Sequence, residues 1–386
     1  MPLKIVEPVA SKQKIKVIGI GGAGCNALVR MNESDIDGVE YVAVNTDIQA
    51  LASSPIKEKV QIGRNLTRGL GAGGNPEIGK QAAHEDEELI KEIFEESEIV
   101  FLTAGLGGGT GTGATPVIAQ IARDKGILVI AVVTKPFDFE GAIRQKQAEQ
   151  GLEELSNTID TVMVIPNQKL FQIAGETITM IDAFRMTDSV LTKSVQAISR
   201  LILKPGMMNI DFAHIRTIMS IKGGSVLGFG EAEGKDRALA AMNQAVSSPM
   251  MEEKELKGAK GVLISFLCGP DLMFNEFKTA VEKIKNISAQ NANIIFGANV
   301  DEKMKDKVMV TVIATGLETA KPKAETDKKD EKEKDKARLI SDLFTEKKPV
   351  PPEEPSQLRK EEHLTYNGEN LEIPAYVREK KRSRFV

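Results

Sequence analysis

The feature that most constrains the fold is a glycine-rich loop between an apolar strand and a helix. Residues 99–104 are nearly all apolar and predict a buried strand, and residues 105–113 then contain six glycines. An amphipathic helix is expected to continue from Ala114. Glycines let a backbone approach a ligand closely, and a helix N-terminus presents free N–H groups and a partial positive charge to an anion. This stretch therefore predicts a phosphate-binding cradle, to which the hydroxyls of Thr110 and Thr112 add donors.

The segments around the cradle alternate between strand and helix patterns. This alternation favours a doubly wound, Rossmann-like α/β domain with its ligand loops at the carboxyl ends of the strands. The aliphatic run at 126–134 is typical of a parallel strand that is covered on both faces. The other predicted strands are 14–20, 40–44 and 161–165, and the predicted helices are a polar one over 77–96 and another over 142–155.

A long helix is predicted over 181–203, because Val190, Leu191, Val195, Ile198, Leu201 and Ile202 form an apolar stripe at helical spacing. Beyond it, strands at 224–232, 261–267, 292–297 and 307–314 alternate with helices at 236–246 and 272–287, which predicts a second α/β domain. The expected divisions are a flexible N-terminus (1–13), a nucleotide-binding domain (14–180), a central helix (181–204) and a C-terminal domain (205–317).

The C-terminal part differs in composition. Residues 321–338 are almost entirely charged and prolines follow at 349–355, so residues 318–369 are predicted to be a disordered linker. Residues 371–378 are apolar and aromatic, and the chain ends on a mostly basic stretch. An apolar cluster after a solvated linker has no core of its own to join, which indicates a docking peptide within 370–386.

Composition excludes several classes of protein. The 386-residue chain has a formal net charge of −4, which provides no general attraction to nucleic acid or acidic lipid. Two cysteines and three scattered histidines suggest neither a disulfide framework nor a zinc site. Aliphatic runs are too short to span a bilayer, and the first residues lack the apolar core of a signal peptide. We therefore expect a cytoplasmic protein.

Two further glycine loops accompany the cradle. Residues 19–24 match G-x-G-x-x-G, and Asp47 follows the next strand, as in a dinucleotide site. By itself this pattern leaves two interpretations, an NAD-dependent oxidoreductase or a tight strand–helix turn. A third loop lies at 69–76, and three such loops together suit a triphosphate better than a dinucleotide. None ends in G-K-[ST], so backbone N–H groups, a helix dipole and bound Mg²⁺ are expected to neutralise the phosphates.

The cradle sequence Gly-Gly-Gly-Thr-Gly-Thr-Gly at 107–113 resembles the signature loop of the tubulin/FtsZ family. Residues 15–316 and the terminal peptide are similar to FtsZ, the tubulin-like GTPase of bacterial cell division. The resemblance implies a GTP-binding domain joined by a long central helix to a second α/β domain. It also implies GTP and GDP as ligands with Mg²⁺, and head-to-tail self-assembly at the mid-cell division ring.

The resemblance also implies a set of GTP-binding residues. The first loop and the segment after the second strand contribute Gly21, Gly22, Ala23, Gly24, Asn26, Asn45 and Asp47. The γ-phosphate loop contributes Ala72, Gly73, Gly74 and Asn75. The cradle contributes Gly105, Gly107, Gly108, Gly109, Thr110, Gly111, Thr112 and Gly113, of which 107–113 hold the α- and β-phosphates. Ribose and base contacts are Pro136, Glu140, Arg144, Asn167, Phe184 and Asp188.

The guanine assignment has a chemical basis. A carboxylate accepts hydrogen bonds from both N1–H and the N2 amino group of guanine, and adenine lacks this pair of donors. Asp188 fits that role, and Phe184 offers a ring for stacking on the base. Without the resemblance, a solvated Asp188 and a core Phe184 are the ordinary interpretations.

The resemblance implies that the catalytic loop comes from a neighbouring subunit. Asp211 matches an acid that positions or polarises the attacking water, and Asn209 matches a supporting polar residue. His214 stands where the family usually has a second aspartate, and a neutral histidine supplies no fixed negative charge. We expect hydrolysis to depend on Asp211 and to be slower than with aspartate at 214. The alternatives are a surface His214 without a chemical role and a polymerising scaffold with little hydrolysis.

The terminal segment resembles the family's adaptor-binding peptide, centred on Ile373, Pro374, Ala375 and Tyr376 and followed by Arg378. Its counterpart binds membrane-tethered division proteins, so we expect the same class of partner. The bland alternative is an incidental apolar tail.

Overall fold

One ten-stranded sheet forms the centre of the folded part of the chain, in the strand order β3-β2-β1-β4-β5-β6-β7-β10-β8-β9. The computed structural model describes residues 14–34, 36, 38–174, 179–203, 207–208, 210–248, 251, 253–317, 365–366 and 369–370. The strands of the sheet are β1 (Ile15–Ile20), β2 (Val39–Asn45), β3 (Glu58–Gln61), β4 (Ile99–Gly105), β5 (Leu128–Lys135), β6 (Thr161–Pro166), β7 (Gly223–Glu233), β8 (Gly261–Cys268), β9 (Asn293–Val300) and β10 (Lys307–Leu317).

The direction of the strands places two of the predicted glycine loops at the carboxyl ends of parallel strands, on one edge of the sheet. β1 to β6 run parallel, and β10 alone in the sheet runs against its neighbours β7 and β8. The order β3-β2-β1-β4-β5-β6 reverses between β1 and β4, which is the switch point where doubly wound sheets bind ligands. Two of the predicted glycine loops follow β1 and β4 directly, so they flank this point.

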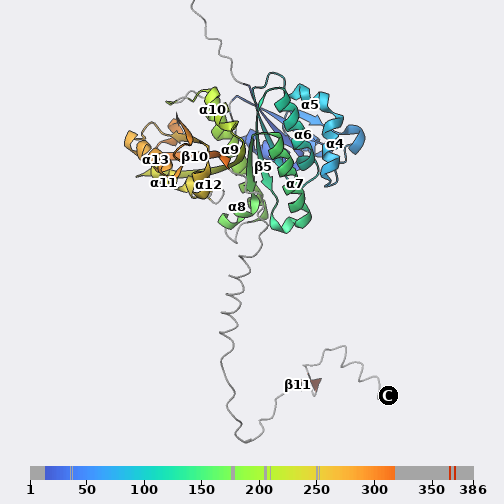
Figure 1. Cartoon of the computed structure of the whole chain (residues 1–386). Coiled ribbons are helices and arrows are strands. Elements are labelled where there is room, and N and C mark those ends of the chain that lie inside the picture. The colour runs from blue at the N-terminus through green and yellow to red at the C-terminus, as the bar shows by residue number, and fades with distance from the viewer. Residues whose placement is uncertain are drawn as a thin grey trace, which may run out of the picture. The chain divides into compact units, whose positions relative to one another are not determined.

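The helices cover the two faces of the sheet (Figure 1). Helices α1, α9 and α10 share one apolar core with the strands, α4 to α7 cover the opposite face of the N-terminal half, and α11 to α13 cover the C-terminal half. Their bounds are α1 (Gly21–Glu33), α2 (Ile48–Ser53), α3 (Arg64–Thr67), α4 (Pro76–Glu85), α5 (Glu87–Ile93), α6 (Thr110–Asp124), α7 (Ala142–Thr158), α8 (Asn167–Ala174), α9 (Met180–Leu203), α10 (Phe212–Met219), α11 (Arg237–Val246), α12 (Glu253–Gly258) and α13 (Phe274–Ile287), with single 3₁₀ turns η1 (Asp138–Glu140) and η2 (Glu302–Met304).

Successive side chains of the central strands point alternately into two hydrophobic cores, one on each face of the sheet. Ile130 and Val132 of β5 lie in the core shared with α1 and α9, whereas Val129, Ala131 and Val133 lie in the core under α4 to α7. Successive side chains of a strand point to opposite faces, so a strand covered on both sides must be apolar throughout. This burial confirms the interpretation of the aliphatic run at 126–134.

Helix α9 connects the two halves of the sheet. It packs on α1, β5 and β6 on one side and on β8 and β9 on the other (Figure 1). Of its predicted stripe, all but the partly buried Ile202 are buried in the core. The sheet is also continuous here, because β6 pairs with β7 over Thr161–Met163. The predicted domain boundaries stay predictions.

Several local predictions were wrong. The polar helix expected over 77–96 is two helices, α4 and α5, which meet at Asp86; its carboxylate accepts a hydrogen bond from the backbone N–H of Gly63 at 2.7 Å. The cradle helix begins at Thr110, four residues before Ala114. The elements α2, β3, α3, α8, α10 and α12 were not predicted. All of them have eight residues or fewer, too short for a periodic pattern to stand out.

Residues 321–386 form a unit separate from residues 1–320. Its described residues are an antiparallel pair, β11 (Thr365–Tyr366) and β12 (Glu369–Asn370), at the end of the predicted linker and the first residue of the predicted terminal peptide. The Asn367-Gly368 sequence between them is typical of tight hairpin turns, a signal that was missed. The predicted N-terminal arm and residues 371–386 of the predicted adaptor peptide lie outside the described residues.

Candidate nucleotide site

A cavity of about 270 Å³ opens at the carboxyl ends of β1, β4, β5 and β6. Ile20, Gly105 and Thr134 from three strand ends line it, and the N-terminal part of α9 closes one side. The cavity brings together residues that lie far apart in the N-terminal half of the sequence, from Ile20 to Leu191. The predicted residues among its lining are Gly22, Ala23, Gly105, Gly108, Gly109, Thr110, Gly111, Pro136, Glu140, Arg144, Asn167, Phe184 and Asp188.

The N-terminus of α6 forms the polar end of this cavity. Helix α6 has no side-chain cap at Gly109 and no acid in its first turn, so its first backbone N–H groups stay available. The Thr112 hydroxyl accepts a hydrogen bond from the N–H of Gly107 at 2.8 Å and so stabilises the loop. Among the described residues that line the cavity there is no lysine, and the cation is Arg144 at the rim. Attraction for an anion therefore comes from backbone donors and the helix dipole, together with the Arg144 guanidinium.

The predicted glycines divide into two groups. A Cβ on Gly22, Gly73, Gly74 or Gly108 would meet nothing within 4 Å, so their backbones face open space. The second group allows the loops to pack against one another: a Cβ on Gly21 would lie 2.8 Å from the nitrogen of Gly111, and one on Gly109 would lie 2.7 Å from Cβ of Ala72. A Cβ on Gly24, Gly107, Gly111 or Gly113 would likewise lie too close to neighbouring atoms. Their contact with nucleotide stays a prediction.

Several predicted polar residues act as caps in this structure. Asp47 Oδ1 accepts from the N–H groups of Gln49 and Ala50 at the start of α2, at 2.8 and 3.1 Å. Asn75 caps α4 by accepting from the N–H of Glu77, and Asn45 Oδ1 accepts from the N–H of Thr46. These three residues do not line the cavity, nor does Asn26, which is exposed on α1. Their roles as ligand contacts are still predictions.

Glu140 and Arg144 form the rim after β5. The guanidinium of Arg144 donates to Glu140 Oε2 at 2.6 Å, and Glu140 Oε1 accepts from the N–H of Phe137 at 2.9 Å. The carboxylate is thereby held just before α7, and the Arg144 side chain that pairs with it is 57% exposed at the rim.

The other end of the cavity is aromatic and acidic. Phe184 is 43% exposed and lies edge-on to Phe137, with ring centroids 5.4 Å apart. Asn167 is buried, and its Oδ1 accepts from the Thr187 hydroxyl at 3.2 Å. The Asp188 side chain is only 15% exposed. These groups provide an exposed ring face beside buried acceptors, as a planar base requires.

Arg30 on α1 is the functional neighbour that the sequence did not reveal. Its Nε donates to Asp188 Oδ2 at 2.7 Å, across 158 positions of sequence. Burial raises the pKa of Asp188 above its ordinary value, and the charge and hydrogen bond of Arg30 oppose that rise. Arg30 thus helps to keep Asp188 ionised. No spacing signal predicts such a contact between α1 and α9.

The predicted catalytic residues lie elsewhere. Asp211 precedes α10 and His214 lies in its first turn; both are exposed and neither lines the cavity. Figure 1 shows α10 at the edge of the sheet opposite α8, which follows the carboxyl end of β6. Asn209 lies outside the described residues. The chain therefore does not bring its own Asp211 to its own cavity.

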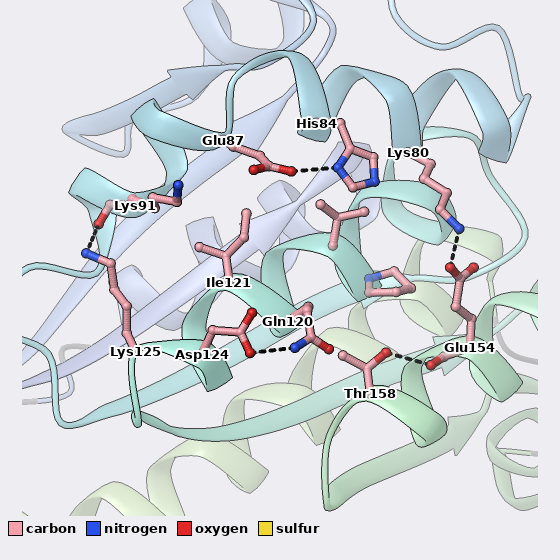
Figure 2. A pocket seen from close by; sticks show the side chains of 12 residues that line it. Lys80, His84, Glu87, Lys91, Gln120, Ile121, Asp124, Lys125, Glu154 and Thr158 are labelled. Carbon is pink, nitrogen blue, oxygen red and sulfur yellow. Dashed lines mark hydrogen bonds and ion pairs between the residues drawn. The ribbon is translucent and has the colours of Figure 1, made fainter.

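A larger hollow of about 600 Å³ lies between α4, α5, α6 and α7, away from the predicted residues (Figure 2). Several of its polar side chains pair with one another: Lys80 with Glu154, His84 with Glu87 at 2.7 Å, and Gln120 with Asp124 at 2.6 Å.

Among the described residues, no helix is both long and apolar enough to cross a membrane. Nor do the described residues contain a group of three or more histidine, cysteine or acidic side chains suited to a metal ion.

This fold, with uncapped backbone donors at a switch point and an aromatic ring with buried acceptors beside them, defines a nucleotide-binding protein of the tubulin-like class. Residues 14–175 match the GTPase-domain model of the tubulin/FtsZ family, and residues 223–318 match the C-terminal-domain model of the FtsZ family. The chain belongs to the FtsZ family and is a cell-division cytoskeletal GTPase that hydrolyses GTP to GDP.

Individual relatives agree. The cell division protein FtsZ of Buchnera aphidicola (subsp. Baizongia pistaciae) is 43% identical over 377 residues, covering 95% of this chain and 96% of that protein. An empty FtsZ dimer from M. jannaschii is 43% identical with a TM-score of 0.75, covering 79% of this chain and 89% of that one. CetZ2 from Haloferax volcanii, solved as a GTPγS-bound protofilament, shares the fold at 21% identity and TM-score 0.70, over 86% and 99% of the two chains.

The family assignment settles one alternative left open by the sequence. A GTPase domain over 14–175 excludes the NAD-dependent oxidoreductase suggested by G-x-G-x-x-G. Asp47, the residue that would bind a ribose in that interpretation, caps α2 in this structure.

Replacing Arg30 tests the ion pair with Asp188. Arg30→Met leaves a mostly buried carboxylate without its cation, so the pKa of Asp188 rises further. At pH 7 the ionised Asp188 then has no partner, which lowers the free energy of unfolding by about 1 kcal/mol. As the pH falls toward 4 the carboxyl protonates in both proteins, so the difference should shrink. Urea unfolding at both pH values measures it.

Arg185→Met is the matched control, because its pair with Asp182 lies on the same helix as Asp188 but is exposed. We expect no measurable change in stability at either pH. A pH-independent loss in Arg30→Met would assign the effect to packing of the side chain instead of its charge.

Proposed function

We propose that the chain assembles head to tail into filaments whose GTPase sites are completed between subunits. The observation that supports this most strongly is the separation of Asp211 from the cavity. Phe184 and Asp188 lie near the N-terminus of α9, and Asp211 follows its far end. With 24 residues, α9 is about 36 Å long. A second subunit stacked along this direction would bring its Asp211 to the cavity.

The phosphates of GTP lie at the N-terminus of α6, where backbone N–H groups and the Thr110 hydroxyl donate to them. Guanine lies at the opposite end, with Asp188 accepting from its N1–H and N2 amino groups and Phe184 against its face. Arg144 is exposed at the rim beside the ribose. The 72–75 loop, whose Gly73 and Gly74 face open space, contacts the γ-phosphate.

Mg²⁺ is the expected companion of the nucleotide. The ion is held mainly by phosphate oxygens and water, with the Thr110 hydroxyl, on a residue that lines the cavity, as a nearby oxygen donor. When bound, it offsets charge on the phosphates.

Hydrolysis requires an aligned water, which the neighbouring Asp211 orients toward the γ-phosphate. Its carboxylate is exposed and makes no side-chain cap on α10, so it is free to meet another subunit. Asn209 supports it. Loss of the γ-phosphate removes a contact at the interface, which couples turnover to disassembly.

The filament acts in the cytoplasm at the mid-cell division ring. Residues 370–386, centred on Ile373, Pro374, Ala375 and Tyr376 with Arg378 beside them, bind membrane-tethered adaptor proteins. Support comes from the apolar and aromatic character of this segment after a charged linker, and from curated relatives that are cell division proteins of nearly the same length.

If each GTPase site is completed by a neighbouring subunit, GTP turnover should begin only above a threshold protein concentration. Phosphate release per subunit should be almost nil at low concentration and rise steeply once light scattering reports polymer. A non-hydrolysable GTP analogue should give scattering without phosphate. Turnover proportional to protein at all concentrations would contradict completion between subunits, and polymer without phosphate release from GTP would favour a scaffold.

Asp211→Ala should abolish phosphate release while leaving the affinity for GTP unchanged, because Asp211 does not line the subunit's own cavity. Phosphate release and equilibrium dialysis with labelled GTP measure the two effects. Glu153→Ala, an exposed acid on α7 outside the cavity lining, is the control and should keep both properties. Lost GTP binding in Asp211→Ala would overturn the interface assignment.

His214→Asp should increase turnover, because an aspartate adds a negative charge that a histidine side chain cannot carry. Phosphate release must be compared at equal polymer mass, so that altered assembly is not mistaken for altered chemistry. Unchanged turnover at matched polymer would mean that His214 has no part in hydrolysis.

A further inference from the structure

A buried hydroxyl pair connects the cavity with the loop after β2. Oγ1 of Thr46 and Oγ1 of Thr110 lie 2.7 Å apart, which is an ordinary O–H···O hydrogen bond. Thr46 is fully buried and does not line the cavity, whereas Thr110 is the first residue of α6 and does. The bond therefore joins a concealed hydroxyl to one on a residue that lines the cavity.

The direction of this bond follows from counting donors and acceptors. A threonine hydroxyl has one proton to donate. For the Thr46 hydroxyl, the described structure records Thr110 as the one partner. If Thr110 donated, the proton of Thr46 would be buried without an acceptor, which is costly. Thr46 therefore donates and Thr110 accepts, so the proton of Thr110 remains free to point into the cavity.

We propose that Thr46 is a positioning residue for GTP, acting by donating to Thr110 so that the Thr110 hydroxyl donates to a phosphate oxygen. The proposal rests on the proposed function, which places phosphates at the start of α6. Donation by Thr46 also polarises the Thr110 hydroxyl and makes it a better donor to an anion. When Thr46 does not donate to it, the Thr110 hydroxyl can donate its proton to an acceptor other than the phosphate.

The backbone around Thr46 holds its hydroxyl in place. The Thr46 N–H donates to Asn45 Oδ1 at 2.9 Å, and its carbonyl accepts from the Thr67 hydroxyl at 3.3 Å. The single proton of the Thr67 hydroxyl is shared with the Gly63 carbonyl at 2.9 Å, and the hydroxyl accepts from the N–H of Gly69. Thr67 thus supports the same loop without touching Thr110, which makes it a control for structural effects.

The test measures the Kd of a fluorescent GTP analogue for the full chain, at protein concentrations below the onset of assembly. Thr46→Val keeps the shape and removes the donor, and we expect the Kd to rise about tenfold. Thr46→Ser restores the hydroxyl and should bind within about twofold of the parent chain. Thr67→Val should leave the Kd unchanged even where urea unfolding shows a loss of stability.

A double variant separates this role from general damage to the loop. Thr110→Val removes the hydroxyl through which Thr46 acts, so adding Thr46→Val to it should weaken binding no further. If Thr46→Val fails to fold, Thr46→Ala carries the same comparison.

The inference is overturned if Thr46→Val binds as tightly as the parent chain, if Thr46→Ser fails to restore binding, if Thr67→Val weakens binding equally, or if the effects at 46 and 110 multiply. Failure of the proposed function, which places the phosphates at the start of α6, has a different signature, because Thr110→Val would then bind the GTP analogue as tightly as the parent chain.

Discussion

Close backbone packing at the start of α6 is the constraint on which the rest of the site depends. Three loops meet there, and each approach is possible only because a side chain is missing: a Cβ on Gly111 would lie 2.6 Å from the Gly105 carbonyl, and one on Gly113 would overlap the Pro76 carbonyl. This packing brings the N-terminus of α6 to the switch point with its N–H groups uncapped. A phosphate site without lysine requires that arrangement.

Within these packed loops, glycines and threonines of the same type have different structural roles. Gly22 and Gly108 leave open space beside the cavity, whereas Gly21 and Gly109 make room for neighbouring backbone and side chains. Thr112 secures the loop through the N–H of Gly107, and Thr110 faces the cavity with Thr46 behind it. A single glycine- and threonine-rich sequence thus supplies both the ligand surface and the support beneath it.

Helix α9 provides the second physical theme, because it sets the distance between the two halves of the catalytic site. Its beginning contributes Phe184 and Asp188 to the cavity, and its end leads toward Asp211 on the opposite edge. A rigid helix buried along most of its length cannot fold back to join these groups. Self-assembly is then a chemical requirement of the proposed reaction.

The sequence by itself determined the alternation of strands and helices, the central helix and its buried stripe, and the family, since strong periodicity and a seven-residue signature are local properties. Thirteen of the predicted residues line one cavity. Only the tertiary structure decided the break at Asp86, the short elements, the Arg30–Asp188 pair and the Thr46–Thr110 bond. The contacts at Asp86, between Thr46 and Thr110, and between Arg30 and Asp188 join residues 23 to 158 positions apart, which no local pattern encodes. The short elements have too few residues for a periodic pattern to stand out.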